Sequence, residues 1–318
     1  MENMSAAAKP KYDPNFTDNV IAATGPNAHP RLKQIMPSLV RHLHDFARDV
    51  DLAVGEWAAG VEMINEAGRM STDRRNETQL LCDVLGLESL VDEITSKLLL
   101  HSTPSATPTP TPTPSAILGP FYRADAPVLP NGSSIVSTAT AGTAWYAEAA
   151  PLLAYVSGRV LSGSGSGSGR PVAGATVDVW LAGPNGLYEQ QDPAQPEMNL
   201  RGRFRTDAGG RYAVRCLRPT AYPIPADGPA GRLLALLDRH PYRPAHIHFI
   251  VSAPGFRTLT TQVFDAEDGY TRDDAVFAVK RELVVRFRER GEDEDEDEEE
   301  GEGRARWELE YDFFLSEE

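Results

Sequence analysis

The sequence predicts an α+β protein in which a helical N-terminal part precedes an antiparallel β-sandwich. Between about residues 30 and 100, apolar residues recur three and four positions apart, which is the spacing of one helix face. After about residue 150 the pattern changes to alternating and β-branched segments separated by Gly and Pro. This second pattern is typical of sandwiches and barrels. A run of Thr and Pro separates the two parts.

The first long helix is predicted to begin near Pro30, because a proline in the first turn of a helix loses no hydrogen bond. The apolar residues that follow share one face: Ile35, Leu39, Leu43, Phe46, Val50 and Val54. A second helical stretch is predicted to start at Thr72 or Asp73, either of which is a suitable N-cap. Its apolar face consists of Leu80, Val84, Leu87 and Val91.

Residues 103–114 read TPSATPTPTPTP. Proline fixes φ and lacks the N–H donor, so this run forms neither a helix nor a central strand. We expect an extended linker without a function of its own. The predicted division is therefore a helical domain over residues 1–116, ending in this linker, and a β-sandwich domain over residues 117–318.

The predicted strands alternate between two faces. In GATVDVWLAG, Val177 and Val179 share one face and Trp180 lies on the other. RFRTDAGGRYAVRCL is predicted to be a hairpin that turns at residues 207–210, and SGSGSGSGR is a flexible connection. An acidic loop, solvated and without a function of its own, is predicted at 291–303.

Charge and composition exclude several classes of protein. The formal net charge is −15, and ten acidic residues lie within residues 292–302, so the remainder carries about −5. This balance argues against nucleic acid as a partner. No apolar stretch reaches the roughly 20 residues of a membrane span, and the first residues do not resemble a secretory signal. Two distant cysteines, Cys82 and Cys216, fit a reducing compartment, and we expect a cytoplasmic protein.

His246 and His248 are the histidines with the clearest functional pattern. RPAHIHFIVSAPG is predicted to be a strand, so both rings project from one face about 6.6 Å apart along it. Two rings at this spacing can converge on one metal ion, although the pair by itself is a weak signal. No neighbouring carboxylate or second cysteine completes a common zinc or two-histidine-one-carboxylate site.

Tyrosines are the other donors near this strand in the sequence. Tyr188 lies in GPNGLYEQQDP, and Tyr222 lies in RPTAYPIPADGP, where prolines stiffen the backbone. Such loops are poor places for a core tyrosine. A phenolate is a hard, anionic donor, so a mixture of tyrosine and histidine favours Fe(III) over zinc or copper.

Residues from about 117 to 288 resemble the intradiol ring-cleaving dioxygenases. The motifs that carry the resemblance are ILGPFYR, SGRV, PVAGATVDVW, NGLYEQQD, FRTDAGGRYAVR, AYPIPADGP, RHPYRPAHIHF and LTTQVF. The resemblance implies non-haem Fe(III) held by Tyr188, Tyr222, His246 and His248. It further implies that the helical part is a dimerisation domain, that the protein is a homodimer, and that a lipid can bind at the dimer interface.

The implied substrates are a small aromatic diol or triol and O2. Ring cleavage between the two hydroxyl-bearing carbons would give cis,cis-muconate from catechol or maleylacetate from hydroxyquinol (benzene-1,2,4-triol). Tyr222 would accept a substrate proton, and Arg243 and Gln262 match the residues beside the substrate. The resemblance also implies a substrate pocket formed by Leu80, Asp83, Ile117, Gly119, Pro120 and Phe121. AYPIPADGP and Asp83, which can accept a hydrogen bond from a third ring hydroxyl, favour hydroxyquinol, with catechol close behind.

Other interpretations of these residues remain open at the level of sequence. Arg243 could pair with an acidic neighbour, Gln262 could satisfy backbone groups, and Asp83 could be a surface helix residue. A non-enzymatic β-sandwich module that binds carbohydrate or protein is the alternative function, with exposed aromatic residues as its contacts. A zinc or copper hydrolase is a third hypothesis, but it requires a further nitrogen or carboxylate ligand that the sequence does not offer.

Overall fold

The computed structural model describes residues 13–102, 111–163, 169–291 and 304–318, without the side chains of residues 99–102. Most of the predicted Thr/Pro linker, of the SGSGSG connection and of the acidic loop lies outside the described residues. The chain forms two compact units, residues 1–63 and 64–318. Among the described residues, no helix combines the length and hydrophobicity that crossing a membrane requires.

The first unit is helical, as predicted. It contains α1 (Phe16–Ala22) and α2 (Pro30–Asp49), and α3 (Val54–Met70) continues across the boundary between the units. The side chain of His29 caps α2 by accepting a hydrogen bond from the Arg31 N–H, and Pro30 occupies the first turn. Thr17 of α1 is bound to α2 through hydrogen bonds with His44 and Arg48.

The second predicted helical stretch is two helices, α4 (Glu77–Val84) and α5 (Leu87–Ser102). The predicted N-cap at Thr72 or Asp73 is wrong: Asn76 caps α4 by accepting from the Gln79 N–H. Gly86, at φ +71°, separates the two helices. The predicted apolar face is divided in the same way, with Leu80 and Val84 buried and Leu87 and Val91 about half exposed.

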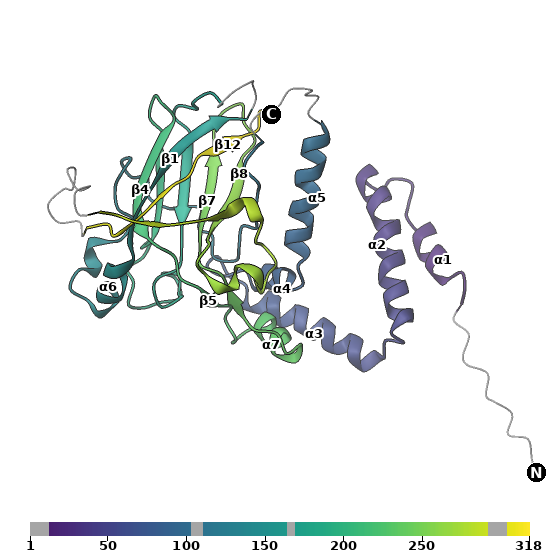
Figure 1. The fold of residues 1–318 in the computed structure, drawn as a ribbon. Helices are drawn as coiled ribbons and strands as arrows, with labels where there is room; N and C mark the ends of the chain where they lie inside the picture. Colours follow the sequence, from purple (N-terminus) through teal and green to yellow (C-terminus); the bar gives the residue numbers. More distant parts are fainter. Residues whose placement is uncertain (1–12, 103–110, 164–168, 292–303) are drawn as a thin grey trace, which may run out of the picture. The chain divides into compact units, whose positions relative to one another are not determined.

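Two five-stranded sheets form the sandwich (Figure 1). In one sheet β1 (Leu153–Ser162) is central and is bordered by β4 (Arg211–Leu217), β11 (Trp307–Glu310) and β12 (Phe313–Leu315), with β10 (Arg288–Glu289) next to β11. The order of the other sheet is β3 (Arg201–Arg205), β2 (Thr176–Trp180), β7 (His246–Ser252), β8 (Leu259–Asp265) and β9 (Val284–Val285). A short pair, β5 (Tyr222–Pro223) and β6 (Tyr242–Arg243), lies outside both sheets.

The predicted β-sandwich is confirmed, but its sheets are mixed rather than purely antiparallel. The pairs β1–β4, β2–β3, β2–β7 and β7–β8 are antiparallel. In contrast, β1 pairs with β11 and β12 in parallel, and so does β8 with β9. Parallel neighbours need long connections, and the C-terminal segment supplies one by returning to β1 from far along the chain.

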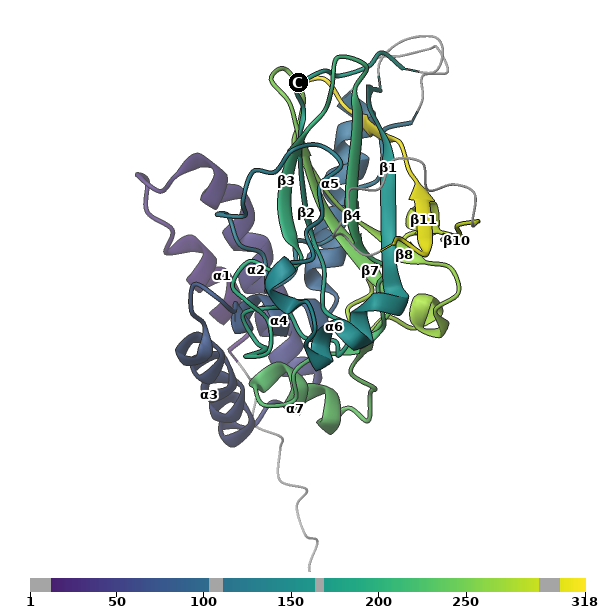
Figure 2. The ribbon, with the colours of Figure 1, turned by 90° about the vertical axis from the view of Figure 1, so that its left-hand side faces the viewer.

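The hairpin predicted around residues 207–210 is also corrected. The turn exists: the Gly210 N–H donates to the Asp207 carbonyl, and Gly210 has φ +73°. However, the strands on its two sides belong to different sheets, because β3 pairs with β2 and β4 pairs with β1. Figure 2 shows β2 and β3 to one side of β4 and β1. The turn residues determine where the chain reverses. Which strand each of β3 and β4 pairs with depends instead on the burial of the apolar faces of the strands.

The main core fills the space between the sheets. Val156, Val177, Val179 and Phe249 are among its fully buried members, so the predicted alternation in β2 is confirmed. The opposite face of β2 is buried as well: Trp180 belongs to a second apolar cluster together with Phe121, Tyr188 and Tyr222. This second cluster surrounds the candidate site.

The helices α4 and α5 belong to the same compact unit as the sandwich, although the predicted division at residue 116 groups them with the preceding helices. Glu77 of α4 is fully buried and accepts the Ala230 N–H of α7 (Pro229–Leu236). At the start of α5, Glu88 accepts from Gln79 Nε2 and from the Leu118 N–H. These contacts join α4 to α7 and to α5, and they join α5 to the loop that contains Leu118.

Candidate metal centre

Two strands and one loop bring four aromatic donors together. His246 and His248 project from the same face of β7, as the alternation predicts. Tyr188 lies in the loop after β2, and Tyr222 lies on β5. All four side chains are at most 6% exposed.

The four donor atoms form a closed ring of short distances. Tyr188 Oη is 3.1 Å from both Tyr222 Oη and His248 Nε2. His246 Nε2 is 3.1 Å from His248 Nε2 and 3.4 Å from Tyr222 Oη. Bonds of first-row metals to histidine are about 2.1 Å long, so two ligands at right angles lie about 3.0 Å apart. The spacing therefore fits four donors around one ion.

Hydrogen bonding supports the same arrangement at His246. Its Nδ1 is 2.7 Å from the Pro244 carbonyl oxygen, which accepts only from a protonated nitrogen. In the neutral ring the lone pair then lies on Nε2, which faces the other donors. Fixing one ring nitrogen in this way is how proteins orient a ligating histidine.

Burial controls the protonation of this centre. It raises the pKa of both phenols and lowers the pKa of both imidazoles well below the usual range. Arg243 lowers the pKa of both histidines further. Neutral imidazoles offer their lone pairs to a cation, and a bound cation would displace the phenol protons.

Clusters of three or more His, Cys, Asp and Glu side chains suited to a metal are absent from the part of the chain that the structure describes. A metal held by the four donors would therefore take half of its ligands from the tyrosines. Phenolates are hard donors that suit a trivalent ion, so the chemistry of the donor set fits ferric iron.

Close backbone approach at two glycines shapes the centre. Gly186 precedes Tyr188 at φ +78°, and a Cβ there would lie 2.7 Å from Tyr222 Cβ. Gly119 has φ +80°, and a Cβ there would lie 3.2 Å from His248 Cε1. Only glycine adopts such φ values without strain. The lack of a side chain thus lets the predicted pocket loop at 117–121 approach His248.

Charged residues behind Tyr188 were not anticipated from the sequence. Arg201 is 2% exposed, donates from Nε to Glu189 Oε2 at 2.7 Å, and lies over the Tyr188 ring. Gln190 accepts from Arg201 and donates to the Phe121 carbonyl. The sequence signal was available in NGLYEQQD, where Glu189 and Gln190 directly follow the tyrosine.

Arg243 and Gln262 lie together beside the histidines. Arg243 Nη2 donates to Gln262 Oε1 at 2.9 Å, and Nη1 is 3.0 Å from His246 Nε2. Gln262 Nε2 donates to the Ile117 carbonyl at 2.8 Å. The acidic neighbour considered for Arg243 also exists: Asp274 pairs with it inside the protein. Arg243 therefore lies beside the histidines and is also paired with an acidic residue.

The residues expected around a substrate are largely buried. Leu80, Asp83, Ile117 and Phe121 are at most 4% exposed, so Asp83 is not a surface residue. The Phe121 ring lies 5.0 Å from the Tyr188 ring, measured between centroids. The backbone of Pro120 accepts from the Asn76 N–H, which joins the loop to the start of α4.

Asp83 is the unusual member of this group. Neither of its carboxyl oxygens has a hydrogen-bond partner among the described residues. Burial, followed by the nearby Glu88 carboxylate, raises the pKa of Asp83 to about 9. At that pKa the carboxyl group would be protonated at pH 7, able to donate one hydrogen bond and to accept others.

The fold and the buried tyrosine–histidine centre define a class, a β-sandwich protein with a donor set suited to a hard metal ion. Residues 147–317 match the family described as Dioxygenase, and residues 29–98 match the family described as Catechol dioxygenase N terminus. The chain belongs to the intradiol ring-cleavage dioxygenase family and is an enzyme of that class.

Individual relatives cover nearly the whole chain. A catechol 1,2-dioxygenase of Candida albicans is 46% identical over 95% of this chain and 92% of its own length. A hydroxyquinol 1,2-dioxygenase of a Rhizobium species is 41% identical over 94% of both chains. A solved hydroxyquinol 1,2-dioxygenase of Pseudomonas putida superposes with a TM-score of 0.75 at 37% identity, covering 95% of this chain and 97% of the other.

Proposed function

We propose that this enzyme uses non-haem Fe(III) and O2 to cleave hydroxyquinol or catechol between two adjacent hydroxyl-bearing carbons. The observation that carries the proposal is the convergence of four buried donor atoms, on Tyr188, Tyr222, His246 and His248, with neighbouring separations of 3.1–3.4 Å. Ferric iron held by these residues would supply Lewis acidity that activates an aromatic diol towards O2.

The side chains around the donors divide the remaining tasks. Tyr222 is the donor that would take a substrate proton at its Oη. Arg243 is permanently charged and faces the centre through Nη1, so it can stabilise negative charge that develops on the ring. Gln262 joins Arg243 to the backbone of Ile117 and so orients the wall of the pocket.

Asp83 favours hydroxyquinol over catechol in this proposal. A buried carboxyl group without a partner is costly, and a third ring hydroxyl would relieve that cost by exchanging hydrogen bonds with it. Catechol lacks this hydroxyl and would leave the carboxyl group unpaired. The remaining pocket positions are Leu80, Ile117, Gly119, Pro120 and Phe121, which are apolar apart from their backbone.

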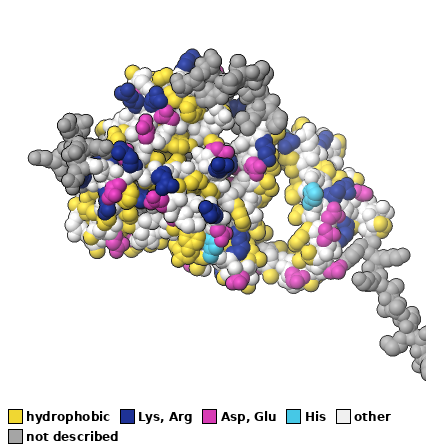
Figure 3. All heavy atoms as spheres, in the orientation of Figure 1, with side chains coloured by type: hydrophobic (Ala, Val, Ile, Leu, Met, Phe, Trp, Pro, Cys, Tyr) yellow, Lys and Arg dark blue, Asp and Glu magenta, His cyan; other side chains and the backbone are white. Residues whose placement is uncertain are grey.

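We also propose that the helical region, residues 1–116, forms a homodimer. Large apolar side chains on α2 and α5 are 40–66% exposed: Ile35, Leu39, Leu43, Phe46, Leu87, Leu90, Val91, Ile94 and Leu98. Two helices with such faces are expected to bury them against a partner. Figure 3 shows charges of both signs interspersed over one face of the described residues.

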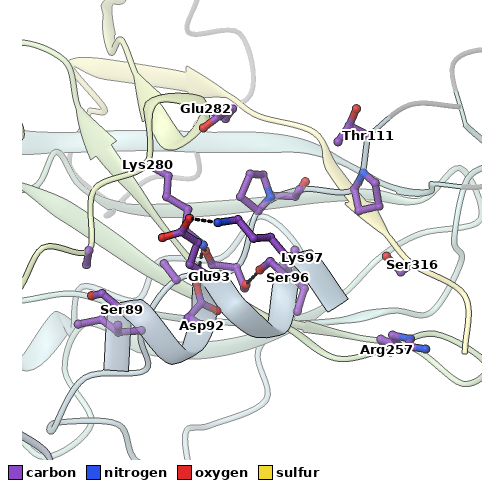
Figure 4. Close-up of a pocket in the computed structure, with 18 of the residues that line it drawn as sticks. Ser89, Asp92, Glu93, Ser96, Lys97, Thr111, Arg257, Lys280, Glu282 and Ser316 are labelled. Carbon is purple, nitrogen blue, oxygen red and sulfur yellow. Dashed lines mark hydrogen bonds and ion pairs between the residues drawn. The ribbon is translucent and has the colours of Figure 1, made fainter. Parts of the chain in front are cut away.

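A lipid is a further proposed ligand at the dimer interface. A cavity of about 1110 Å³ lies between α5, residues 111–117 and the C-terminal strand β12. Figure 4 shows Ser89, Asp92 and Ser96 on the α5 side of this cavity, with Lys280 on another side. The four donor residues do not line it.

Both cysteines are free thiols, which supports the proposed cytoplasmic location.

The decisive experiment combines colour, metal content and turnover. The purified protein, loaded with iron in air, should be wine-red from tyrosinate-to-iron charge transfer. Turnover of benzene-1,2,4-triol and of catechol is then followed by ultraviolet absorbance and oxygen uptake, and a Tyr188→Phe variant shows whether the colour depends on this tyrosine. A colourless protein with one iron per chain and no oxygen uptake would contradict the proposal.

A further inference from the structure

Residues 273–280 form a loop between two short 3-10 helices, η3 (Gly269–Arg272) and η4 (Arg281–Leu283). Within this loop Asp274 is only 6% exposed. We propose that Asp274 is a positioning residue, which holds the guanidinium of Arg243 in the orientation that ring cleavage requires. This inference rests on the proposed function.

The contacts of Arg243 leave its guanidinium little freedom. Nε donates to Asp274 Oδ1 at 3.2 Å, and Nη2 lies 3.4 Å from Asp274 Oδ2. Nη2 also donates to Gln262 Oε1. Because Nε and Nη2 are occupied in this way, Nη1 is the nitrogen that remains directed at the donor cluster, 3.0 Å from His246 Nε2.

Asp274 is itself held by the backbone. Its Oδ1 accepts from the Val276 N–H at 3.2 Å and its Oδ2 from the Ala278 N–H at 3.0 Å. Each carboxylate oxygen therefore has one backbone donor in addition to the guanidinium. A carboxylate that accepts backbone hydrogen bonds at both oxygens cannot rotate with the arginine, so it holds the guanidinium group in one orientation.

The rest of the loop is anchored at its other end. Lys280 donates to the Ser115 carbonyl and pairs with Asp92 of α5. Ser115 is two residues before Ile117, whose carbonyl accepts from Gln262. Asp274 lies in the loop that ends at Lys280, and Gln262 binds the segment that contains Ser115. Because Lys280 binds Ser115, the loop of Asp274 and the segment bound by Gln262 are held together.

Charge gives a second reason for the pair. Side-chain exposure is 4% for Arg243 and 2% for Asp274. An isolated charge in such surroundings is strongly disfavoured. Asp274 supplies the opposite charge beside the guanidinium of Arg243, with Nε and Oδ1 3.2 Å apart. An asparagine at position 274 would have the size of the aspartate. It would offer one acceptor oxygen in place of two, and its N–H₂ group would face N–H donors.

The first test compares Asp274→Asn with Asp273→Asn, the same change at the adjacent residue, whose side chain is 77% exposed. We expect Asp274→Asn to keep its iron and its absorption band while kcat for benzene-1,2,4-triol and catechol falls about 10–100-fold. Asp273→Asn should retain the activity of the parent. Equal activity of the two variants, or loss of iron from Asp274→Asn, would overturn the proposal.

A double-mutant cycle separates positioning from general damage. If Asp274 acts only through Arg243, then Asp274→Asn should change kcat by less than about twofold in an Arg243→Met background. A full additive loss in that background would mean that Asp274 acts elsewhere.

The same cycle measured by thermal unfolding does not depend on activity. Asp274→Asn should lower Tm by roughly 5 °C in the parent and by much less when Arg243 is already replaced. An absent coupling would refute the pairing even in an inactive protein. An inactive, colourless parent that still shows the coupling would instead refute the proposed function and, with it, the catalytic purpose of the pair.

Discussion

The indole ring of Trp180 lies parallel to the imidazole ring of His248, with centroids 4.6 Å apart and planes 10° apart. The two residues face each other across neighbouring strands, β2 and β7. His248 Nδ1 is buried without a hydrogen-bond partner among the described residues. The orientation of His248 therefore depends on stacking, whereas that of His246 depends on its hydrogen bond to Pro244.

Replacing Trp180 by leucine should weaken iron binding about 10–100-fold, the usual effect of losing a contact that orients a ligand. Iron retention during dialysis against a chelator measures this, and the absorption band should broaden as His248 gains freedom. Trp307→Leu is the matched control, because Trp307 lies on β11 in the other sheet. Equal iron retention in both variants would show that the stack does not orient His248.

Loss of one donor should release the metal. His246→Ala is expected to abolish iron retention and colour, since a four-donor centre that loses one ligand binds far more weakly. His240→Ala removes a partly exposed histidine that pairs with Asp273, and it should leave the iron content unchanged. Iron retained at one per chain by His246→Ala would remove His246 from the ligand set. Metal analysis of both purified proteins decides the point.

Asp83 should make folding stability depend on pH. Its folded pKa of about 9 lies above the unfolded value of about 3.9. The group therefore contributes its full stability below about pH 4, and this contribution is lost as the pH rises towards 9. Asp83→Asn cannot ionise, so its Tm relative to the parent should rise with pH. At pH 7 we expect the free energy of unfolding of Asp83→Asn to exceed that of the parent by on the order of 1–3 kcal/mol.

Thermal unfolding between pH 4 and 9 measures this difference. The control is Asp73→Asn, an exposed residue that precedes α4. Its Tm should follow that of the parent across the range. A constant difference between Asp83→Asn and the parent at every pH would mean that folding does not raise the pKa of Asp83.

Gly119 and Gly132 provide a matched pair of glycines. Both have positive φ, +80° and +91°, but only at Gly119 would a Cβ meet another group, His248 Cε1 at 3.2 Å. Alanine should cost about 1 kcal/mol at either position through backbone strain. Only Gly119→Ala should also slow turnover and shift the iron absorption band, because His248 must move. Identical spectra and rates in both variants would contradict the close approach.

Local patterns in the sequence were sufficient for the class of fold and for part of the centre. Alternation placed His246 and His248 on one strand face. The helical spacing after Pro30 was correct as far as Phe46, but α2 ends at Asp49, so Val50 and Val54 do not continue its face. The tyrosines needed the resemblance to a family as well, because a tyrosine in a loop has no periodicity that shows where it points.

Tertiary structure decided which distant groups became partners. It placed Asp274 against Arg243 and stacked Trp180 on His248. It also buried Asp83 without a hydrogen-bond partner in the part of the chain that the structure describes, and it separated the strands on either side of the turn at residues 207–210 into different sheets. Periodicity reports only the face on which a residue lies, since it follows from backbone geometry over a few residues. Partners 31 or 68 positions apart in the chain are selected by the packing of complete faces and by the cost of leaving buried charge unpaired.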